Sequence, residues 1–146
     1  MRAYEYRYVV SFEDTNVVGN VYYANHIRWQ GRCREMFLRD YVPDVLEELS
    51  RGLVLVTLRV SCEYYQELAA FDELVIRMRL GELSQHRMKL LFEYWRLPAS
   101  GDAGGDEVLT ARGEQELACM GRHGEKLEPQ AWPASFLEAL RPYAEG

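Results

Sequence analysis

Residues in one predicted helix and in the loop before it could stabilise negative charge on an oxygen atom without titrating. The helix begins near Tyr23 and Ala24, where unpaired backbone N–H groups and the positive end of the helix dipole point outward. Asn16, in the preceding loop, has a carboxamide with donor and acceptor groups but no useful pKa. Arg34, further along the helix, keeps its charge and presents a planar fork of donors. These groups could polarise a carbonyl and hold a water molecule beside it.

The loop and helix that carry these residues follow an alternating segment. Side chains alternate in polarity over residues 2–12, which predicts a half-buried strand. Residues 13–23 contain the Asn, Thr and Gly of a loop. A helix is expected from residue 24 to residue 38 or slightly beyond, because Trp29, Cys33, Met36 and Phe37 form one apolar stripe. Gly31 in its interior suggests a close approach by a neighbouring element.

Four further strands are expected after this helix. Pro43 and Gly52 bracket a short helix over residues 44–51, and alternation predicts strands over 53–65, 72–83, 86–97 and 107–120. The glycine-rich residues 99–106 predict a flexible hairpin loop, and residues 135–140 a short helix. This order indicates a single α+β domain over residues 1–146, with a five-stranded antiparallel sheet wrapped around one long central helix. In the first of the four strands, the residues expected to share one face are Val54, Val56, Leu58, Val60, Cys62 and Tyr64.

Composition excludes several classes of function. A formal net charge of -6 opposes binding to nucleic acid. No apolar run is long enough to span a membrane, and residues 1–5 lack the apolar core of a secretory signal, so we expect a cytoplasmic protein. Cys33, Cys62 and Cys119 form no CxxC pair and are expected to be small buried hydrophobes. No metal or cofactor is implied, and His26 is expected to be structural.

The segment FEDTNVVGNVYYAN (residues 12–25) and the order of elements resemble the hotdog-fold thioesterases of the 4-hydroxybenzoyl-CoA thioesterase type, over nearly the whole chain. That family shows D-x-D-x-x-G-x-V-[YW]-[YH]-x-N here, and its second Asp, the catalytic carboxylate, is Asn16 in this chain. Many relatives also have a helix Glu in Y-E-R-A-R, where residues 30–34 read QGRCR. With RWQGRCREMFL following, the chain looks like the acyl-carrier-protein thioesterases that accompany enediyne polyketide synthases.

The resemblance implies hydrolysis of a β-keto polyene acyl thioester on the phosphopantetheine arm of a polyketide synthase carrier domain. Asn16 and Arg34 would act in place of a carboxylate, with the Tyr23 amide as oxyanion donor. The released β-keto acid would be prone to decarboxylation to a methyl ketone. The positions expected to contact substrate are Tyr22, Asn25, Thr57, Glu63 and Tyr65.

The resemblance also implies a homo-oligomer, with a dimer of dimers favoured. Sites in this fold lie between subunits, so Asn16 and Arg34 need not come from one chain. Two alternatives stay open: a general acyl-CoA thioesterase, and a non-catalytic acyl-binding or synthase-docking protein. Docking on an acidic carrier domain would use basic residues. These are Arg28, Arg32, Arg77, Arg79, Arg87 and Lys89.

Overall fold

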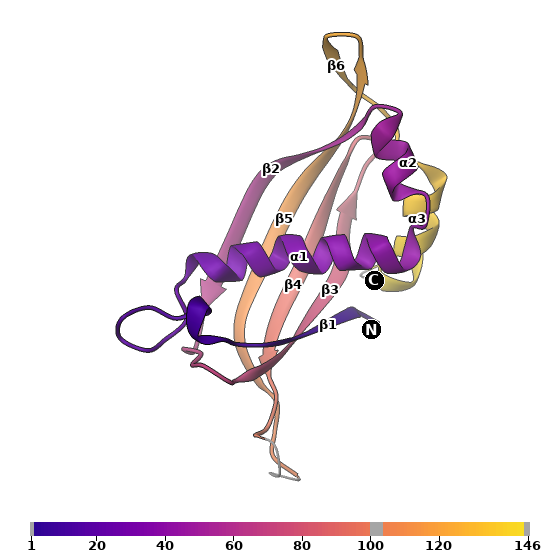
Figure 1. Ribbon diagram of the computed structural model, residues 1–146. Helices are drawn as coiled ribbons and strands as arrows, with labels where there is room; N and C mark the ends of the chain where they lie inside the picture. The colour runs from indigo at the N-terminus through magenta and orange to yellow at the C-terminus, as the bar shows by residue number, and fades with distance from the viewer. Residues whose placement is uncertain (1, 100–103, 145–146) are drawn as a thin grey trace.

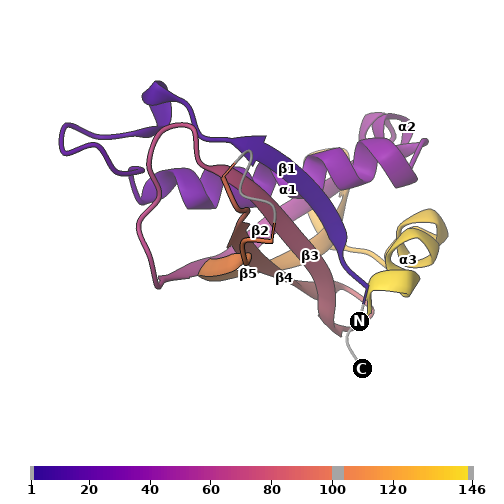
Figure 2. The same ribbon diagram turned by 90° about the horizontal axis from the view of Figure 1, so that it is seen from below.

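A curved antiparallel sheet wraps around one long helix, α1 (Ala24–Tyr41), in the computed structural model, which describes residues 2–99 and 104–144 (Figure 1). The sheet order is β1-β3-β4-β5-β2, and β6 pairs with β5. The strands are β1 (Tyr4–Val9), β2 (Leu53–Tyr64), β3 (Glu73–Leu83), β4 (Arg87–Arg96), β5 (Val108–His123) and β6 (Lys126–Pro129). The smaller elements are α2 (Val45–Ser50), α3 (Ala134–Leu140) and the 3-10 turns η1 (Phe12–Asp14) and η2 (Arg141–Tyr143). Figure 2 shows α1 on one side of the sheet.

The apolar stripe predicted for α1 is confirmed. Trp29, Cys33 and Phe37 are buried, and Met36 packs against the same core. The helix runs to Tyr41, slightly beyond residue 38 as expected. Its stripe faces a continuous apolar surface on the sheet, which is the ordinary reason for an amphipathic helix to lie there.

The inward faces of β3 and β4 are also as predicted. Leu74, Ile76, Met78 and Leu80 occupy every second position of β3, and all four are buried, as is Val75 between the first two. On β4 the buried partners occupy every second position, and antiparallel pairing sets Ile76 opposite Tyr94. These buried β4 residues are Met88, Leu90, Phe92 and Tyr94.

The single face predicted for β2 is wrong, because a bulge lies within the strand. The pairing with β5 shifts between Thr57 and Arg59, which leaves Leu58 as the extra residue. Leu55 before the bulge and Cys62 after it both pack against the core. They are seven positions apart, so in a regular strand their side chains would lie on opposite faces. An extra residue reverses the alternation, so one strand can keep two apolar stretches against the same helix.

Two other strand boundaries differ from the prediction. The first strand ends at Val9, and Phe12 lies in η1 with 71% of its surface exposed. The last long strand continues to His123 and returns as β6, so the sheet has six strands where five were expected. Of the predicted hairpin loop, residues 100–103 lie outside the described residues.

The helix makes a close contact with the sheet at Gln30. This side chain is fully buried, and its Nε2 donates a hydrogen bond to the Ser61 carbonyl of β2 at 2.9 Å. Gly113 of β5 leaves the space: a Cβ there would overlap Gln30 Nε2 and lie 2.9 Å from the Ser61 oxygen. The close approach that was predicted at Gly31 therefore occurs at Gly113.

We expect Gly31→Ala to stabilise the protein by up to about 1 kcal/mol, since alanine is the better helix former. A Cβ at Gly31 would have no heavy atom within 4 Å outside its own helix and chain neighbours. Urea unfolding measures the change. Gly113→Ala is the contrasting variant, and it should lose about 1–3 kcal/mol because the core there has no room for a methyl group. If both variants changed the free energy of unfolding in the same direction, the assignment of the close contact to Gly113 would be wrong.

Candidate active site

The amino end of α1 presents two free backbone donors. Among the described residues, neither the Tyr23 N–H nor the Ala24 N–H donates a hydrogen bond, whereas the Asn25 N–H binds the Tyr22 carbonyl at 2.9 Å. The Tyr64 hydroxyl donates to the Tyr23 carbonyl at 2.7 Å. Because that carbonyl and the Ala24 N–H belong to one planar peptide group, Tyr64 also fixes the direction of the N–H. The helix start can therefore hold an anionic oxygen.

Asn16 lies in the loop that leads to this helix start. Its backbone N–H donates to the Asn20 carbonyl at 2.8 Å, and its Oδ1 accepts the Val18 N–H at 3.0 Å. The second contact is an Asx turn, which leaves Nδ2 as the free end of the carboxamide among the described residues. Asn16 itself is exposed. It can thus offer a hydrogen-bond donor to a carbonyl oxygen or to water.

A surface cavity of about 280 Å³ opens beside the helix start. Tyr65, one of the predicted substrate contacts, lines it, and its hydroxyl donates to Glu63 Oε2 at 3.2 Å. Burial is the main cause that raises the pKa of Tyr64 to about 12, so this phenol stays a donor at neutral pH. The lining comprises Asn20, Val21, Tyr23, His26, Tyr64, Tyr65, Gln66, Glu67 and Leu68.

The other predicted substrate contacts have different surroundings. Tyr22 is exposed, and its ring centroid lies 4.7 Å from that of Tyr23. Asn25 is buried, and its Nδ2 donates to the Asp14 carbonyl at 2.8 Å, so this side chain holds the loop against the helix. Thr57 is exposed on β2, directly before the bulge.

The Arg34 side chain lies against β5, away from the helix start. Its NH1 donates to Gln115 Oε1 at 3.1 Å, and its Nε is buried without a hydrogen-bond partner among the described residues. No carboxylate of the described chain lies within ion-pair distance of the guanidinium. Burial lowers the pKa of Arg34 from its ordinary value, yet a guanidinium stays charged at neutral pH. Arg34 is thus a largely buried cation that has no ion-pair partner within the described part of the chain.

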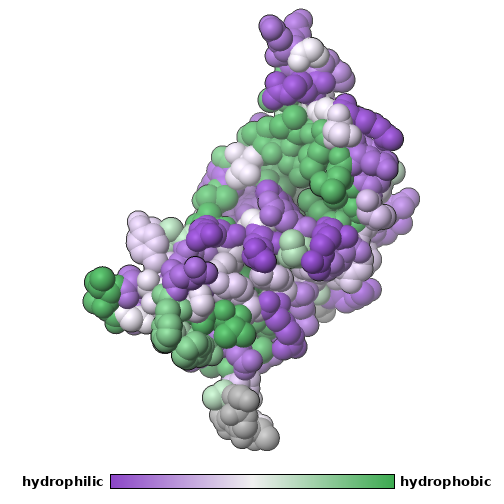
Figure 3. All heavy atoms as spheres, viewed as in Figure 1, coloured by the Kyte–Doolittle hydropathy of each residue, from purple (hydrophilic) through white to green (hydrophobic). Residues whose placement is uncertain are grey.

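A small apolar cavity adjoins Arg34. Its volume is about 20 Å³, enough for about one water molecule. Trp132 in its wall has a buried Nε1 that lacks an acceptor among the described residues. The remaining lining is formed by Phe37, Leu38, Leu55, Met78, Met88, Leu90, Leu117, Phe136 and Leu140. Figure 3 shows the hydrophobic area that lies above α1, between β2 and α2.

One chain does not bring Asn16 and Arg34 together. The loop of Asn16 extends beyond the amino end of α1 (Figure 1). Arg34 is ten residues after Ala24, which corresponds to about 15 Å along the helix axis. The predicted site residues therefore form two separate groups in one chain, one at the helix start and one at Arg34.

His26 lies at the helix-start cavity but is enclosed by aromatic rings. It is 3% exposed, and the ring centroids of Tyr64, Tyr94 and Trp29 lie 4.8, 5.1 and 5.2 Å away. Neither ring nitrogen has a hydrogen-bond partner among the described residues. Burial lowers the pKa of His26 from 6.5 to about 4. The structural role predicted for this residue fits these surroundings.

We expect the free energy of unfolding to fall by about 2 kcal/mol between pH 7.5 and pH 5 because of His26. The unfolded state takes up this proton near pH 6.5 and the folded state only near pH 4, so acid favours unfolding within that window. His26→Phe should remove this part of the pH dependence, as measured by urea unfolding at both pH values. His123→Gln, at an exposed histidine, should leave it unchanged. An equal slope in His26→Phe and the wild type would refute the assignment.

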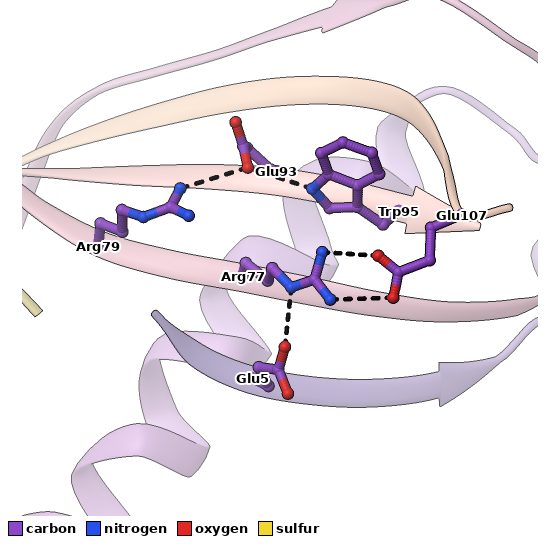
Figure 4. Close-up of polar contacts among 6 residues, drawn as sticks. All are labelled: Glu5, Arg77, Arg79, Glu93, Trp95 and Glu107. Carbon is purple, nitrogen blue, oxygen red and sulfur yellow. Dashed lines mark hydrogen bonds and ion pairs between the residues drawn. The ribbon is translucent and has the colours of Figure 1, made fainter. Parts of the chain in front are cut away.

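The basic residues on the outer sheet face do not form a free cationic patch. Arg77 binds Glu5 and Glu107, and Arg79 binds Glu93, which also accepts the Trp95 indole N–H (Figure 4). Lys89 lies within 4 Å of both Glu114 and Glu116. Of the six basic residues predicted for docking, Arg28, Arg32 and Arg87 have no carboxylate partner among the described residues. Carrier docking on this sheet face therefore has weak support.

The family model of the thioesterase-like superfamily matches residues 10–140. The chain belongs to this superfamily. Solved structures agree with it. Crystal structures of the dynemicin thioesterase, which revealed induced-fit and allosteric effects upon polyene binding, superpose with a TM-score of 0.90 at 45% identity, covering 99% of both chains.

A more distant solved structure has the same hotdog fold. The 4-hydroxybenzoyl-CoA thioesterase of Pseudomonas sp. strain CBS-3 is 22% identical, with a TM-score of 0.77 over 95% of this chain and 99% of its own. A protein of Aquifex aeolicus (strain VF5), provisionally named an esterase, is 33% identical over 89 residues. The aligned segment covers 61% of this chain and 68% of the Aquifex protein. The protein is thus a thioesterase of the hotdog fold, as the sequence motif predicted.

Two residues that contact the candidate site residues, Tyr64 and Gln115, were not identified from the sequence. Tyr64 fixes the helix-start peptide and Gln115 binds Arg34. The alternation of the last long strand places Gln115 on the buried face between Gly113 and Leu117, and a polar side chain on such a face is the signal that could have identified it.

Other features favour no additional chemistry. Burial raises the pKa of Cys62 and Cys119 to about 11, and that of Cys33 further, so none is an activated thiol. Cys33 and Cys119 are buried as predicted, whereas Cys62 is only partly buried. Within the described residues, no helix is both long and apolar enough to cross a bilayer.

Proposed function

We propose that this thioesterase hydrolyses a β-keto polyene acyl thioester on the phosphopantetheine arm of a carrier domain in an iterative enediyne polyketide synthase. The observation that carries the proposal is the largely buried Arg34 guanidinium, which binds only the neutral Gln115 amide among the described residues and adjoins an apolar cavity. The guanidinium can bind a carbonyl or carboxylate oxygen of a ligand, and the apolar cavity beside it can accept the ligand's hydrocarbon chain. The 45% identity to the dynemicin thioesterase supports a polyene as that chain.

The helix start would stabilise the reaction's negative charge. A water oxygen bonds to the acyl carbon, the carbon–sulfur bond breaks, and the proton that the water loses passes to the leaving thiolate. The Tyr23 and Ala24 N–H groups face the developing oxyanion, and Asn16 Nδ2 orients the water or the carbonyl. One preorganised donor of this kind stabilises the transition state by about 3–4 kcal/mol. No carboxylate is needed in these steps.

Arg34 would bind the second carbonyl of the β-keto chain. Its fork can donate two hydrogen bonds and stabilise enolate-like charge between the two carbonyls. The β-keto acid that is released can then lose carbon dioxide and form a methyl ketone. Both steps use the same property of the substrate, a second carbonyl two carbons from the thioester.

Two chains would complete each site. β2 is an edge strand that pairs only with β5 among the described strands, and Leu58 and Val60 on it are 41% and 43% exposed. Pairing of two β2 edges in opposite directions would set the Tyr64 end of one strand near the Leu55 end of the other. The helix start of one chain would then face Arg34 of its partner. A homodimer, or a dimer of such dimers, follows from this arrangement.

The acyl chain needs more room than one protomer offers. The cavity at Arg34 holds about 20 Å³, and one wall consists of Trp132 and Phe136 near and within α3. Binding of a polyene would displace these side chains. The remaining predicted contacts, Tyr22, Thr57 and the pair Glu63 and Tyr65, lie on the exposed surface of the helix-start end and of β2.

The direct experiment incubates the purified protein with a polyketide synthase whose carrier domain is loaded with the polyene. Mass spectrometry of the carrier domain should show loss of the acyl group, and the organic extract should contain the acid or the methyl ketone. A carrier domain that keeps its acyl group would refute the proposal. Faster turnover of palmitoyl-CoA than of the carrier-bound polyene would favour a general acyl-CoA thioesterase.

A further inference from the structure

The concave face of β5 carries one polar long side chain among small and apolar ones. Alternate residues of this strand, from Ala111 to Cys119, are buried against α1. Gln115 is 3% exposed, and its cross-strand neighbours are Val60 on β2 and Leu90 on β4. A buried amide among apolar residues costs free energy unless it is hydrogen bonded. Its partner is Arg34 NH1, at 3.1 Å.

An amide at this position has two consequences for Arg34. The amide oxygen binds one terminal nitrogen and so restricts the rotation of a long side chain. At the same time the amide is neutral, so the guanidinium keeps its full charge. A carboxylate at this position would form a buried ion pair with Arg34 and satisfy its charge internally.

We propose that Gln115 is a positioning residue, which aims the Arg34 guanidinium at the acyl ligand and, because it is uncharged, leaves that cation available to the ligand's oxygen atoms. This inference rests on the proposed function of Arg34. It adds a requirement of its own: position 115 needs a hydrogen-bond acceptor without a negative charge.

Gln115→Glu and Gln115→Met separate the two requirements. Glutamate keeps the size and the acceptor but neutralises Arg34, so kcat on the β-keto thioester should fall by about 100-fold. Methionine keeps the size and the charge of Arg34 but loses the acceptor, so we expect a smaller fall, of about 10-fold. Gln85→Glu makes the same chemical change in the exposed turn between β3 and β4, and should leave kcat unaltered.

Binding of decanoate, measured by isothermal titration calorimetry, gives a readout that does not depend on turnover. Wild type should bind this carboxylate, Gln115→Met more weakly, and Gln115→Glu at least 10-fold more weakly than Gln115→Met. Thermal unfolding should show that Gln115→Glu is at least as stable as Gln115→Met, since its new carboxylate is paired.

The outcomes distinguish this inference from the proposed function. An active wild type with an equally active Gln115→Glu variant would overturn the role of Gln115 and leave the thioesterase activity intact. A wild type that cannot hydrolyse the thioester refutes the proposed function, and the decanoate affinities then still test the pairing. Equal decanoate affinity in wild type and Gln115→Glu would overturn the inferred role of Gln115.

Discussion

Arg34→Ala should lower kcat for release of the β-keto polyene by at least about 100-fold while the fold is retained. The substitution removes a cation that no carboxylate of the described chain neutralises, so no ion pair is broken. In a site sheltered from water, loss of one charged donor to a developing anion has an effect of this size. The loss of a desolvated charge also offsets the cavity that the shorter side chain leaves. Single-turnover release from the loaded carrier domain, followed by mass spectrometry, measures the rate.

Arg39→Ala is the matched control for this experiment. Arg39 lies on the same helix, binds the neighbouring Asp40 and has a side chain that is 69% exposed. Release by this variant should equal that of the wild type. A carbonyl binding role further predicts that a saturated acyl thioester, which lacks the second carbonyl, loses much less rate in Arg34→Ala. Full turnover of the β-keto substrate by Arg34→Ala would remove this residue from the mechanism.

The parts of the fold that follow from local pattern could be predicted from the sequence. The stripe of Trp29, Cys33 and Phe37 and the alternation on β3 and β4 each depend on neighbours along the chain, and they were correct. The motif around Asn16 identified the hotdog fold because the residue types and their spacing were matched over a long segment. Helix ends and strand ends were less accurate, since fraying and pairing decide them.

Features that depend on pairing between distant segments could not be predicted. The bulge at Leu58 is visible only when β2 is aligned with β5, and the extension of β5 into β6 depends on pairing of Met120 with Pro129. The contact between Arg34 and Gln115 joins residues 81 positions apart. The prediction of a close approach at Gly31 was wrong, because a glycine inside a helix does not by itself indicate a close neighbour. The close contact is made at Gly113 on the facing strand.

A mixture of two inactive variants, Asn16→Ala and Arg34→Ala, should recover about a quarter of the wild-type activity. If a site takes Asn16 from one chain and Arg34 from the other, a heterodimer of the two variants has one intact site and one doubly altered site. Random pairing makes about half of the dimers heterodimers, and half of their sites work. The structure motivates this test, because Arg34 lies about 15 Å along α1 from Ala24, whereas the loop of Asn16 extends beyond the amino end of that helix (Figure 1).

Co-expression of the two variants with different affinity tags allows the heterodimer to be isolated by two successive purifications. The purified heterodimer should show about half of the wild-type activity, and each homodimer should show almost none. The double variant Asn16→Ala with Arg34→Ala, paired with wild type, is the control. Both sites of that heterodimer carry one altered residue, so it should be inactive if the site is shared and half active if each chain holds a whole site. Recovery in that control, and none in the first heterodimer, would place Asn16 and Arg34 in one chain's site.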